Sequence, residues 1–163
     1  MAGMDDLNVE LRLPPLHQIG VVVKDINRVL DSYSSLFGIG PFTVYEFIPD
    51  KQWFMEERTY FKAIYGKAML GGVELCIMEP VEGRSIHNVF LETHGEGLMN
   101  LGFHTPNYEE MFDKFLRAGF EPVARAESYV ESYKGYLKGC YFDTRSIGGV
   151  LIEIMFKSWL TKN

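Results

Sequence analysis

Hydrophobic residues recur along the chain in two patterns, one typical of strands and one typical of helices. Runs rich in β-branched and aromatic residues, each bounded by Gly, Pro or charge, predict strands. Besides a first strand in each of the two repeated segments described below, we expect six of them, at residues 42–48, 60–70, 73–78, 123–129, 136–142 and 150–156. Apolar residues at helical spacing predict helices over residues 25–37 and 107–119, each ended by a glycine, and a linking helix over 85–92.

Two segments of the chain occur twice, in the same order. Leu-His-Gln-Ile-Gly-Val at 16–21 resembles Leu-Met-Asn-Leu-Gly-Phe at 98–103, and the Gly-Gly-Val run that begins at 71 resembles the one that begins at 148. The offsets are 82 and 77 residues, which indicates duplication of a unit of roughly 60–80 residues. Each unit reads as strand, helix and three strands, so an α+β fold of two βαβββ modules is predicted.

This organisation divides the chain into a short leader and a single domain. The leader covers residues 1–13 and the domain residues 14–163. Within the domain, module one spans about 16–80, the linker helix about 85–94 and module two about 98–156. A length of 163 residues with 47% hydrophobic and 23% charged residues suits one folded domain.

Charge and hydropathy narrow the range of partners. The net charge of −6 argues against nucleic acid or an anionic membrane surface as the main partner, because both attract basic proteins. No apolar run reaches the roughly 18 residues of a membrane span, and the acidic N-terminus has no signal-peptide block. With only two cysteines and no support for a disulfide, a cytoplasmic protein is expected.

Four segments carry a resemblance to a known superfamily. They are Leu-His-Gln-Ile-Gly at 16–20, Glu-Pro-Val-Glu-Gly-Arg-Ser at 79–85, His-Gly-Glu-Gly-Leu-Met-Asn at 94–100 and Gly-Val-Leu-Ile-Glu at 149–153. From about residue 16 to 156 the chain resembles the vicinal oxygen chelate superfamily of glyoxalases, bleomycin resistance proteins and methylmalonyl-CoA epimerases. The resemblance implies two curled mixed sheets around a cavity, in which four strand residues commonly hold a divalent metal.

The metal positions of that superfamily carry over to Gln18, Cys76, Asn100 and Glu153. The superfamily usually has His, Glu or Gln, His and Glu there, so only Glu153 is the expected residue type. Gln and Asn offer neutral carbonyl oxygens in place of imidazole, which should weaken the binding of a transition metal. We therefore expect no metal cofactor. A divalent metal held by these four residues is the alternative, and all four should point into one cavity.

The register of the first strand decides which neighbour faces that cavity. Successive side chains of a strand point to opposite faces, so His17 faces away if Gln18 faces the cavity. The repeat supports this register, because it aligns Met99 with His17 and Asn100 with Gln18.

The same alternation adds Glu74 and His104 to the candidate substrate-binding residues. Glu74 shares a face with Cys76, and His104 shares a face with Asn100. A shifted metal or acid–base site that uses Glu74, His104 and Glu153 is one interpretation. Solvated polar residues at strand ends are the other, and two further histidines, His87 and His94, are expected at the surface of the linker.

Glu153 is the candidate catalytic residue, because it lies in an otherwise apolar strand. A carboxylate buried there must be hydrogen-bonded, paired or protonated. It suits a general base with a raised pKa that moves a proton next to a carbonyl, with Gln18 and Asn100 as donors to a developing oxyanion. A structural role, in which the two amides merely hold the carboxylate, is the alternative.

Aromatic side chains and methionines are abundant enough to line a pocket for an apolar small molecule as well as a core. Residues 50–58 contain several of them in a predicted loop, which we interpret as a lid or a dimer contact.

Three functions fit these observations, in this order. The first is a glyoxalase-like isomerase, epimerase or lyase with a degenerate metal site and a small-molecule ligand. The second is a metal-free protein of the bleomycin-resistance type that sequesters a small molecule. The third is a metal-dependent methylmalonyl-CoA epimerase or lactoylglutathione lyase with variant ligands. Unpaired first-strand edges need partners, so a homodimer, or a monomer whose two units pair internally, is expected.

Overall fold

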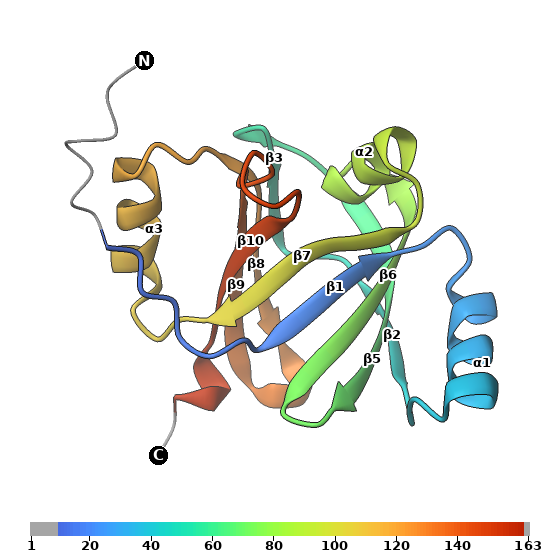
Figure 1. Ribbon diagram of the computed structural model, residues 1–163. Coiled ribbons are helices and arrows are strands. Elements are labelled where there is room, and N and C mark those ends of the chain that lie inside the picture. Colours follow the sequence, from blue (N-terminus) through green and yellow to red (C-terminus); the bar gives the residue numbers. More distant parts are fainter. Residues whose placement is uncertain (1–9, 162–163) are drawn as a thin grey trace.

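The computed structural model describes residues 10–161, and Figure 1 shows its elements. Residues 1–9 of the expected leader and residues 162–163 lie outside this part. The strands are β1 Gln18–Val22, β2 Thr43–Phe47, β3 Lys51–Phe54, β4 Glu57–Arg58, β5 Phe61–Leu70, β6 Val73–Gly83, β7 Gly97–His104, β8 Pro122–Val130, β9 Gly135–Phe142 and β10 Leu151–Lys157. The helices are α1 Ile26–Phe37, α2 Ile86–Thr93 and α3 Tyr108–Arg117. None of the helices described is long and apolar enough to cross a membrane.

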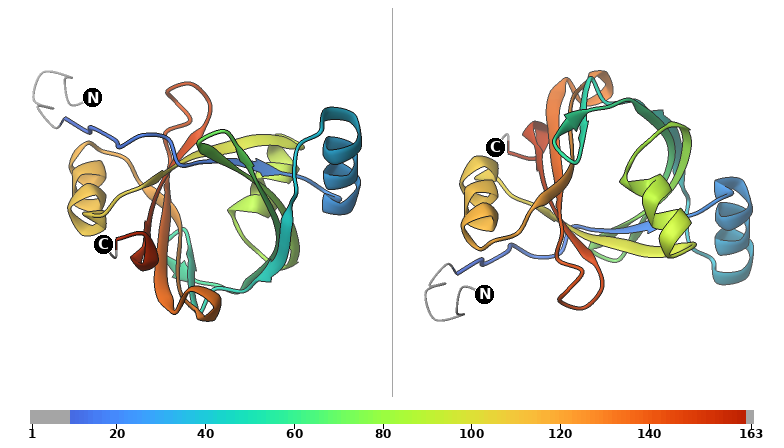
Figure 2. Two further views of the ribbon diagram at one scale, coloured as in Figure 1. Left: turned by 90° about the horizontal axis from the view of Figure 1, so that it is seen from below. Right: turned by 90° about the horizontal axis from the view of Figure 1, so that it is seen from above.

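The strands form one curled sheet that joins two units. Its order is β2-β5-β6-β1-β7-β10-β9-β8-β3-β4, so the four strands of unit one are followed by the four strands of unit two. In each unit the first strand runs parallel to the last, β1 beside β6 and β7 beside β10, and β1 and β7 pair antiparallel between the units. Figure 2 shows the sheet curling around a central space. The two predicted βαβββ modules are confirmed.

Helices α1 and α3 lie on opposite outer flanks of the sheet (Figures 1 and 2). The side chain of Asp25 accepts a hydrogen bond from the backbone N–H of Arg28 at the start of α1, and Gly38 ends the helix with a φ of 65°. On α3, Phe115 stacks on Phe142 of β9 with ring centroids 4.4 Å apart. Leu11 packs against the same cluster, so the end of the expected leader is attached to the domain.

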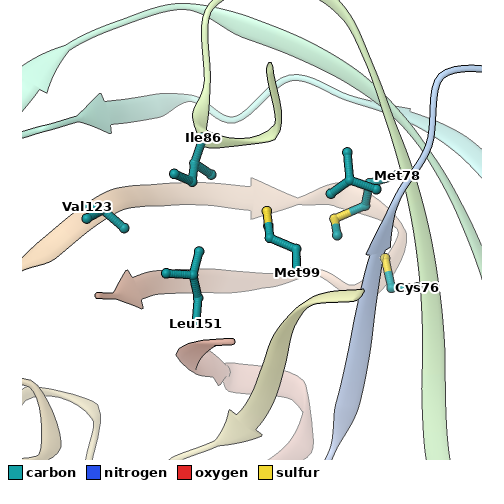
Figure 3. Packing of buried hydrophobic residues seen from close by; sticks show 7 residues of the cluster. Cys76, Met78, Ile86, Met99, Val123 and Leu151 are labelled. Atoms are coloured by element: carbon teal, nitrogen blue, oxygen red, sulfur yellow. The ribbon is translucent and has the colours of Figure 1, made fainter. Parts of the chain in front are cut away.

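Helix α2 packs against the concave side of the sheet. Its Ile86 joins a buried cluster with Met78 of β6, Met99 of β7, Val123 of β8 and Leu151 of β10 (Figure 3). Because this cluster draws on strands from both units, it fixes the linker helix over the junction between them.

Residues 50–58 differ from the prediction of a loop. They form the β3–β4 hairpin, which belongs to unit one but pairs antiparallel with β8 of unit two, from Lys51 opposite Glu127 to Phe54 opposite Ala124. The guanidinium groups of Arg58 and Arg125 lie 5.0 Å and 4.7 Å from the centroid of the Trp53 ring. The hairpin therefore extends the sheet of unit two and ties the units together.

Candidate functional site

A row of paired residues crosses the four central strands at the junction of the two units. Glu74 of β6 pairs with Gln18 of β1, Gln18 with Gly102 of β7, and Gly102 with Glu153 of β10. A Cβ atom on Gly102 would lie 2.6 Å from the Met155 Cε and 3.3 Å from both the Gln18 Cβ and the Glu153 Oε2. The glycine thus lets a polar side chain of each unit approach the other.

Two amide–carboxylate hydrogen bonds organise this row. The Gln18 Nε2 donates to the Glu74 Oε1 at 2.6 Å, and the Asn100 Nδ2 donates to the Glu153 Oε2 at 2.9 Å. Asn100 is fully buried and lies over Gly20, where any Cβ would collide with the Asn100 side chain. Each unit thus contributes one amide and one carboxylate.

Cys76 pairs with Gly20, which in turn pairs with Asn100, two pairs along the strands from Gln18. It is 1% exposed and packs beside Met78 in the apolar cluster (Figure 3), and burial raises the pKa of its thiol to about 12. Of the four residues expected to point into one cavity, Gln18 and Glu153 line it, whereas Cys76 and Asn100 are buried beneath it, with Asn100 in contact with Glu153. The structure places Glu74, rather than Cys76, beside Gln18.

Two lysines that the sequence reasoning missed surround Glu74. The Lys67 Nζ lies 3.3 Å from the Glu74 Oε1, and the Lys157 Nζ lies 3.9 Å from the same oxygen. The alternation of strand positions would have found them, because Lys157 shares a face with Glu153 four residues earlier and Lys67 pairs with Cys76.

The two carboxyl groups differ in acidity because their surroundings differ. Burial raises the pKa of Glu153 to about 7, although the charges of Lys157 and Lys67 and the Asn100 hydrogen bond act in the opposite direction. Burial alone would also raise the pKa of Glu74, but the adjacent charges of Lys67 and Lys157 and the Gln18 hydrogen bond lower it overall. At neutral pH Glu74 is ionised, and Glu153 can both take and release a proton.

His17 does not face away from the cavity as expected. It immediately precedes β1 and lines the cavity, with its Nε2 3.0 Å from the Lys157 Nζ. Burial and the charge of Lys157 lower its pKa to about 4, so the ring is neutral and accepts from the lysine.

His104 is not brought into contact with the two carboxylates. Its ring lies 6.0 Å from that of His17 and 6.3 Å from that of Phe156, and neither of its nitrogens has a hydrogen-bond partner among the residues described. Within residues 10–161 there is no group of three His, Cys, Asp or Glu side chains arranged to hold a metal ion. The arrangement gives no support to the shifted site of Glu74, His104 and Glu153.

A cavity of about 900 Å³ opens over the polar row. Its walls are mostly apolar and aromatic, and they include Phe47, Trp53, Phe61, Met78, Met155 and Trp159. His87 also lines it and is only 1% exposed, which corrects the expectation of a surface residue, whereas His94 is exposed as expected. The hairpin, helix α2 and both units thus contribute to one cavity, and four of its charged residues, Lys67, Glu74, Glu153 and Lys157, lie at the junction of the units.

Comparison with known proteins identifies the superfamily to which this chain belongs. The family model described as glyoxalase/bleomycin resistance protein/dioxygenase superfamily matches residues 17–136. The chain belongs to this superfamily. No curated protein sequence matches it.

Solved structures of the superfamily fold superpose over most of the chain at low identity. A hypothetical protein from Bacillus halodurans has a TM-score of 0.61 and 18% identity, covering 91% of this chain and 97% of that one. Methylmalonyl-CoA epimerase from Mycobacterium tuberculosis has a TM-score of 0.59 and 19% identity, covering 88% of each chain. A Streptomyces coelicolor methylmalonyl-CoA epimerase variant in complex with 2-nitronate-propionyl-CoA has a TM-score of 0.60 and 17% identity, covering 90% of this chain and 99% of that one. At these identities the likeness shows the fold alone.

Members of this superfamily often use a divalent metal, but the residues at the junction do not suit one. Gln18 and Asn100 already donate their N–H groups to the two carboxylates, and the ammonium groups of Lys67 and Lys157 flank Glu74. A divalent cation at this point would meet two fixed positive charges and neutral amide oxygens instead of imidazoles. The ammonium groups of Lys67 and Lys157 supply the positive charge that a metal ion would otherwise provide.

Proposed function

We propose that this superfamily member catalyses proton transfer at a carbon next to a carbonyl group of a small molecule, without a bound metal. The observation that carries the proposal is the partly buried Glu153, whose pKa is raised to about 7, next to a cluster that holds two ammonium groups. A base whose pKa is close to neutral is efficient at accepting and returning a proton at physiological pH.

The polar residues at the junction have separate roles in this reaction. The Glu153 carboxylate takes the proton from the carbon and becomes a carboxylic acid, while the electron pair moves to the carbonyl oxygen as an enolate. The ammonium groups of Lys67 and Lys157 and the amide of Gln18 stabilise the negative oxygen. Glu153 then returns the proton to the same carbon or to its neighbour. Glu74 holds the two ammonium groups in place.

The fold gives this proposal a precedent, because two of the solved neighbours are methylmalonyl-CoA epimerases, one bound to an acyl-CoA analogue. A second function, sequestration of an apolar small molecule, is favoured by the size and the largely apolar walls of the cavity.

Hydrogen exchange separates the two functions. The protein is incubated in deuterium oxide with acyl thioesters, α-hydroxy compounds and keto compounds, and deuterium uptake is measured by mass spectrometry. We expect exchange next to the carbonyl whose rate rises with pH around a midpoint near 7 as Glu153 ionises. Glu153→Gln should slow it by about 10²–10⁴-fold. Glu92→Gln, at an exposed position of α2, is the matched control.

Exchange that persists in Glu153→Gln would remove this residue from the mechanism. A ligand that occupies the cavity without any exchange would favour sequestration. Elemental analysis of protein purified without chelators tests the metal-free part of the proposal, and a near-stoichiometric metal bound through Gln18 or Glu74 would refute it.

A further inference from the structure

His87 on α2 is a buried polar side chain that the proposed reaction does not use. Its ring lies among three aromatic rings that also line the cavity, with centroid distances of 5.6 Å to Phe61, 6.4 Å to Tyr65 and 6.0 Å to Tyr141. The Nε2 atom is buried and has no hydrogen-bond partner among the residues described. An unpaired buried acceptor or donor costs about 1–3 kcal/mol, so such an atom calls for an explanation.

Neighbouring hydrogen bonds fix the tautomer of this ring. The backbone N–H of Ser85 donates to the Asn88 Oδ1 at 2.9 Å, which identifies that atom as the amide oxygen. The Ser85 Oγ lies 3.0 Å from the same oxygen, which can only accept, so the hydroxyl donates its one hydrogen to the Asn88 Oδ1. The His87 Nδ1, 3.1 Å from the Ser85 Oγ, must then be the donor of that contact. It follows that Nε2 carries no proton and is a hydrogen-bond acceptor.

The surroundings of Nε2 restrict what it can accept. Burial lowers the pKa of His87 to about 4, so the ring stays neutral. The three rings around it are those of Phe61, Tyr65 and Tyr141, and bringing a charged ammonium group among them would cost much of its hydration energy. Carboxylates, ethers and ketones carry no hydrogen that they could donate to Nε2. A neutral hydroxyl on an apolar ring meets both conditions, since the ring packs against the aromatic walls while the hydroxyl donates.

We propose that the α2 side of the cavity is a subsite for a ring-bearing apolar ligand that donates a hydroxyl hydrogen to the His87 Nε2. The relevance of this subsite to catalysis rests on the proposed function. If both hold, the substrate is a hydroxylated aromatic or alicyclic carbonyl compound. Binding at the subsite itself requires no proton transfer.

The test uses 4-ethylphenol, ethylbenzene and 4-ethylanisole, which share the ethylphenyl ring and carry opposite the ethyl group a hydroxyl, a hydrogen and a methoxy group, so that only the first can donate a hydrogen bond. Affinities for the unmodified protein and for His87→Phe are measured by titration calorimetry. The preference for 4-ethylphenol over ethylbenzene should fall by about five- to tenfold in His87→Phe, the loss expected for one hydrogen bond. Ethylanisole, which cannot donate, should gain nothing from His87. His94→Phe, an exposed histidine directly after the same helix, is the matched control.

Nitrogen NMR of the unmodified protein keeps the proposal testable if His87→Phe does not fold. With four histidines in the chain, ¹⁵N-labelled imidazoles can be resolved, and the unprotonated Nε2 signal of His87 should shift upfield on addition of 4-ethylphenol but not of ethylbenzene. An unchanged preference in His87→Phe, a protonated Nε2, or no binding of 4-ethylphenol would overturn the proposal. Glu153→Gln should retain the preference, so a failure of the proton-transfer mechanism and a failure of this subsite give different results.

Discussion

Glu153 is an acidic residue on an apolar strand, and its burial has a consequence for stability. Its pKa is about 7 in the folded protein against an ordinary value of 4.5. Between these values the folded state binds more protons than the unfolded state, so this residue makes the protein less stable as pH rises from about 4.5 to 7.

The change Glu153→Gln tests this by removing the titration. The free energy of unfolding of the variant, relative to the unmodified protein, should increase by about 3 kcal/mol between pH 4 and pH 8. Urea denaturation at both pH values measures it. A difference that does not vary with pH would mean that Glu153 titrates as an ordinary carboxyl group.

Gly20 is a second residue at the site that affects stability, because it has no side chain. Gly20→Ala would place a methyl group against the buried side chain of Asn100. We expect the free energy of unfolding to fall by about 2 kcal/mol because the packed junction cannot easily expand. Gly72→Ala, where a Cβ would meet nothing within 4 Å, is the control and should be close to neutral. Adding Asn100→Ala to Gly20→Ala should recover part of the loss, and no recovery would contradict this explanation.

The sequence predicted most of the site residues but paired one of them incorrectly. Gln18, Asn100 and Glu153 follow from the superfamily resemblance together with the repeat and the strand period. Cys76 was also carried over from the superfamily, in which this ligand stands four residues before a proline that closes the strand, here Pro80. Instead β6 continues to Gly83, and its pairing with β5 is irregular where Pro80 faces Ala63. In the pairing with β1, Glu74 lies opposite Gln18 and Cys76 lies opposite Gly20. His87 was missed because the sequence of one short helix does not show which face lies over a cavity.

Among the elements, the β3–β4 hairpin is the one that the sequence did not predict. Its two strands are only four and two residues long, and its turn lacks the Asn-Gly or Asp-Gly pair that usually marks a hairpin. Met55 and Glu56 occupy the turn with φ angles of 50° and 65°, a conformation that favours glycine and asparagine. The other strands and helices are longer and strongly periodic, and their bounds differ from the predictions by a few residues at most, except at the end of β6.

Replacing the turn residues should stabilise the hairpin. Met55→Asn with Glu56→Gly installs the favoured pair, and we expect the free energy of unfolding to rise by about 1–2 kcal/mol. Loss of the exposed ion pair between Glu56 and Arg125 offsets little of this gain. Thermal denaturation measures the change. Glu57→Gly, within β4, is the control and should not stabilise the protein. A destabilised double variant would contradict the turn geometry.

At the scale of the whole molecule, the pairing of β1 with β7 satisfies the first-strand edges within one chain. The edges that remain are β2 and β4, and β2 exposes Val44 at 51%. We still expect a homodimer, because an unpaired strand edge with exposed apolar residues tends to find a partner. Light scattering over a range of concentrations should give twice the mass of one chain, whereas the mass of a single chain would support the alternative, a monomer whose two units pair internally. An assembly of six or more chains would contradict this.

The position of the hairpin in the sheet has a consequence for biosynthesis. Lys51 pairs with Glu127, so the ribosome completes β3 76 residues before its partner strand. At a synthesis rate of about 5–20 residues per second, the nascent hairpin waits about 4–15 seconds with Trp53 and Phe54 uncovered. The hairpin cannot take its place in the sheet until β8 has been synthesised, and until then the nascent chain exposes an apolar segment that holdase chaperones are suited to shield.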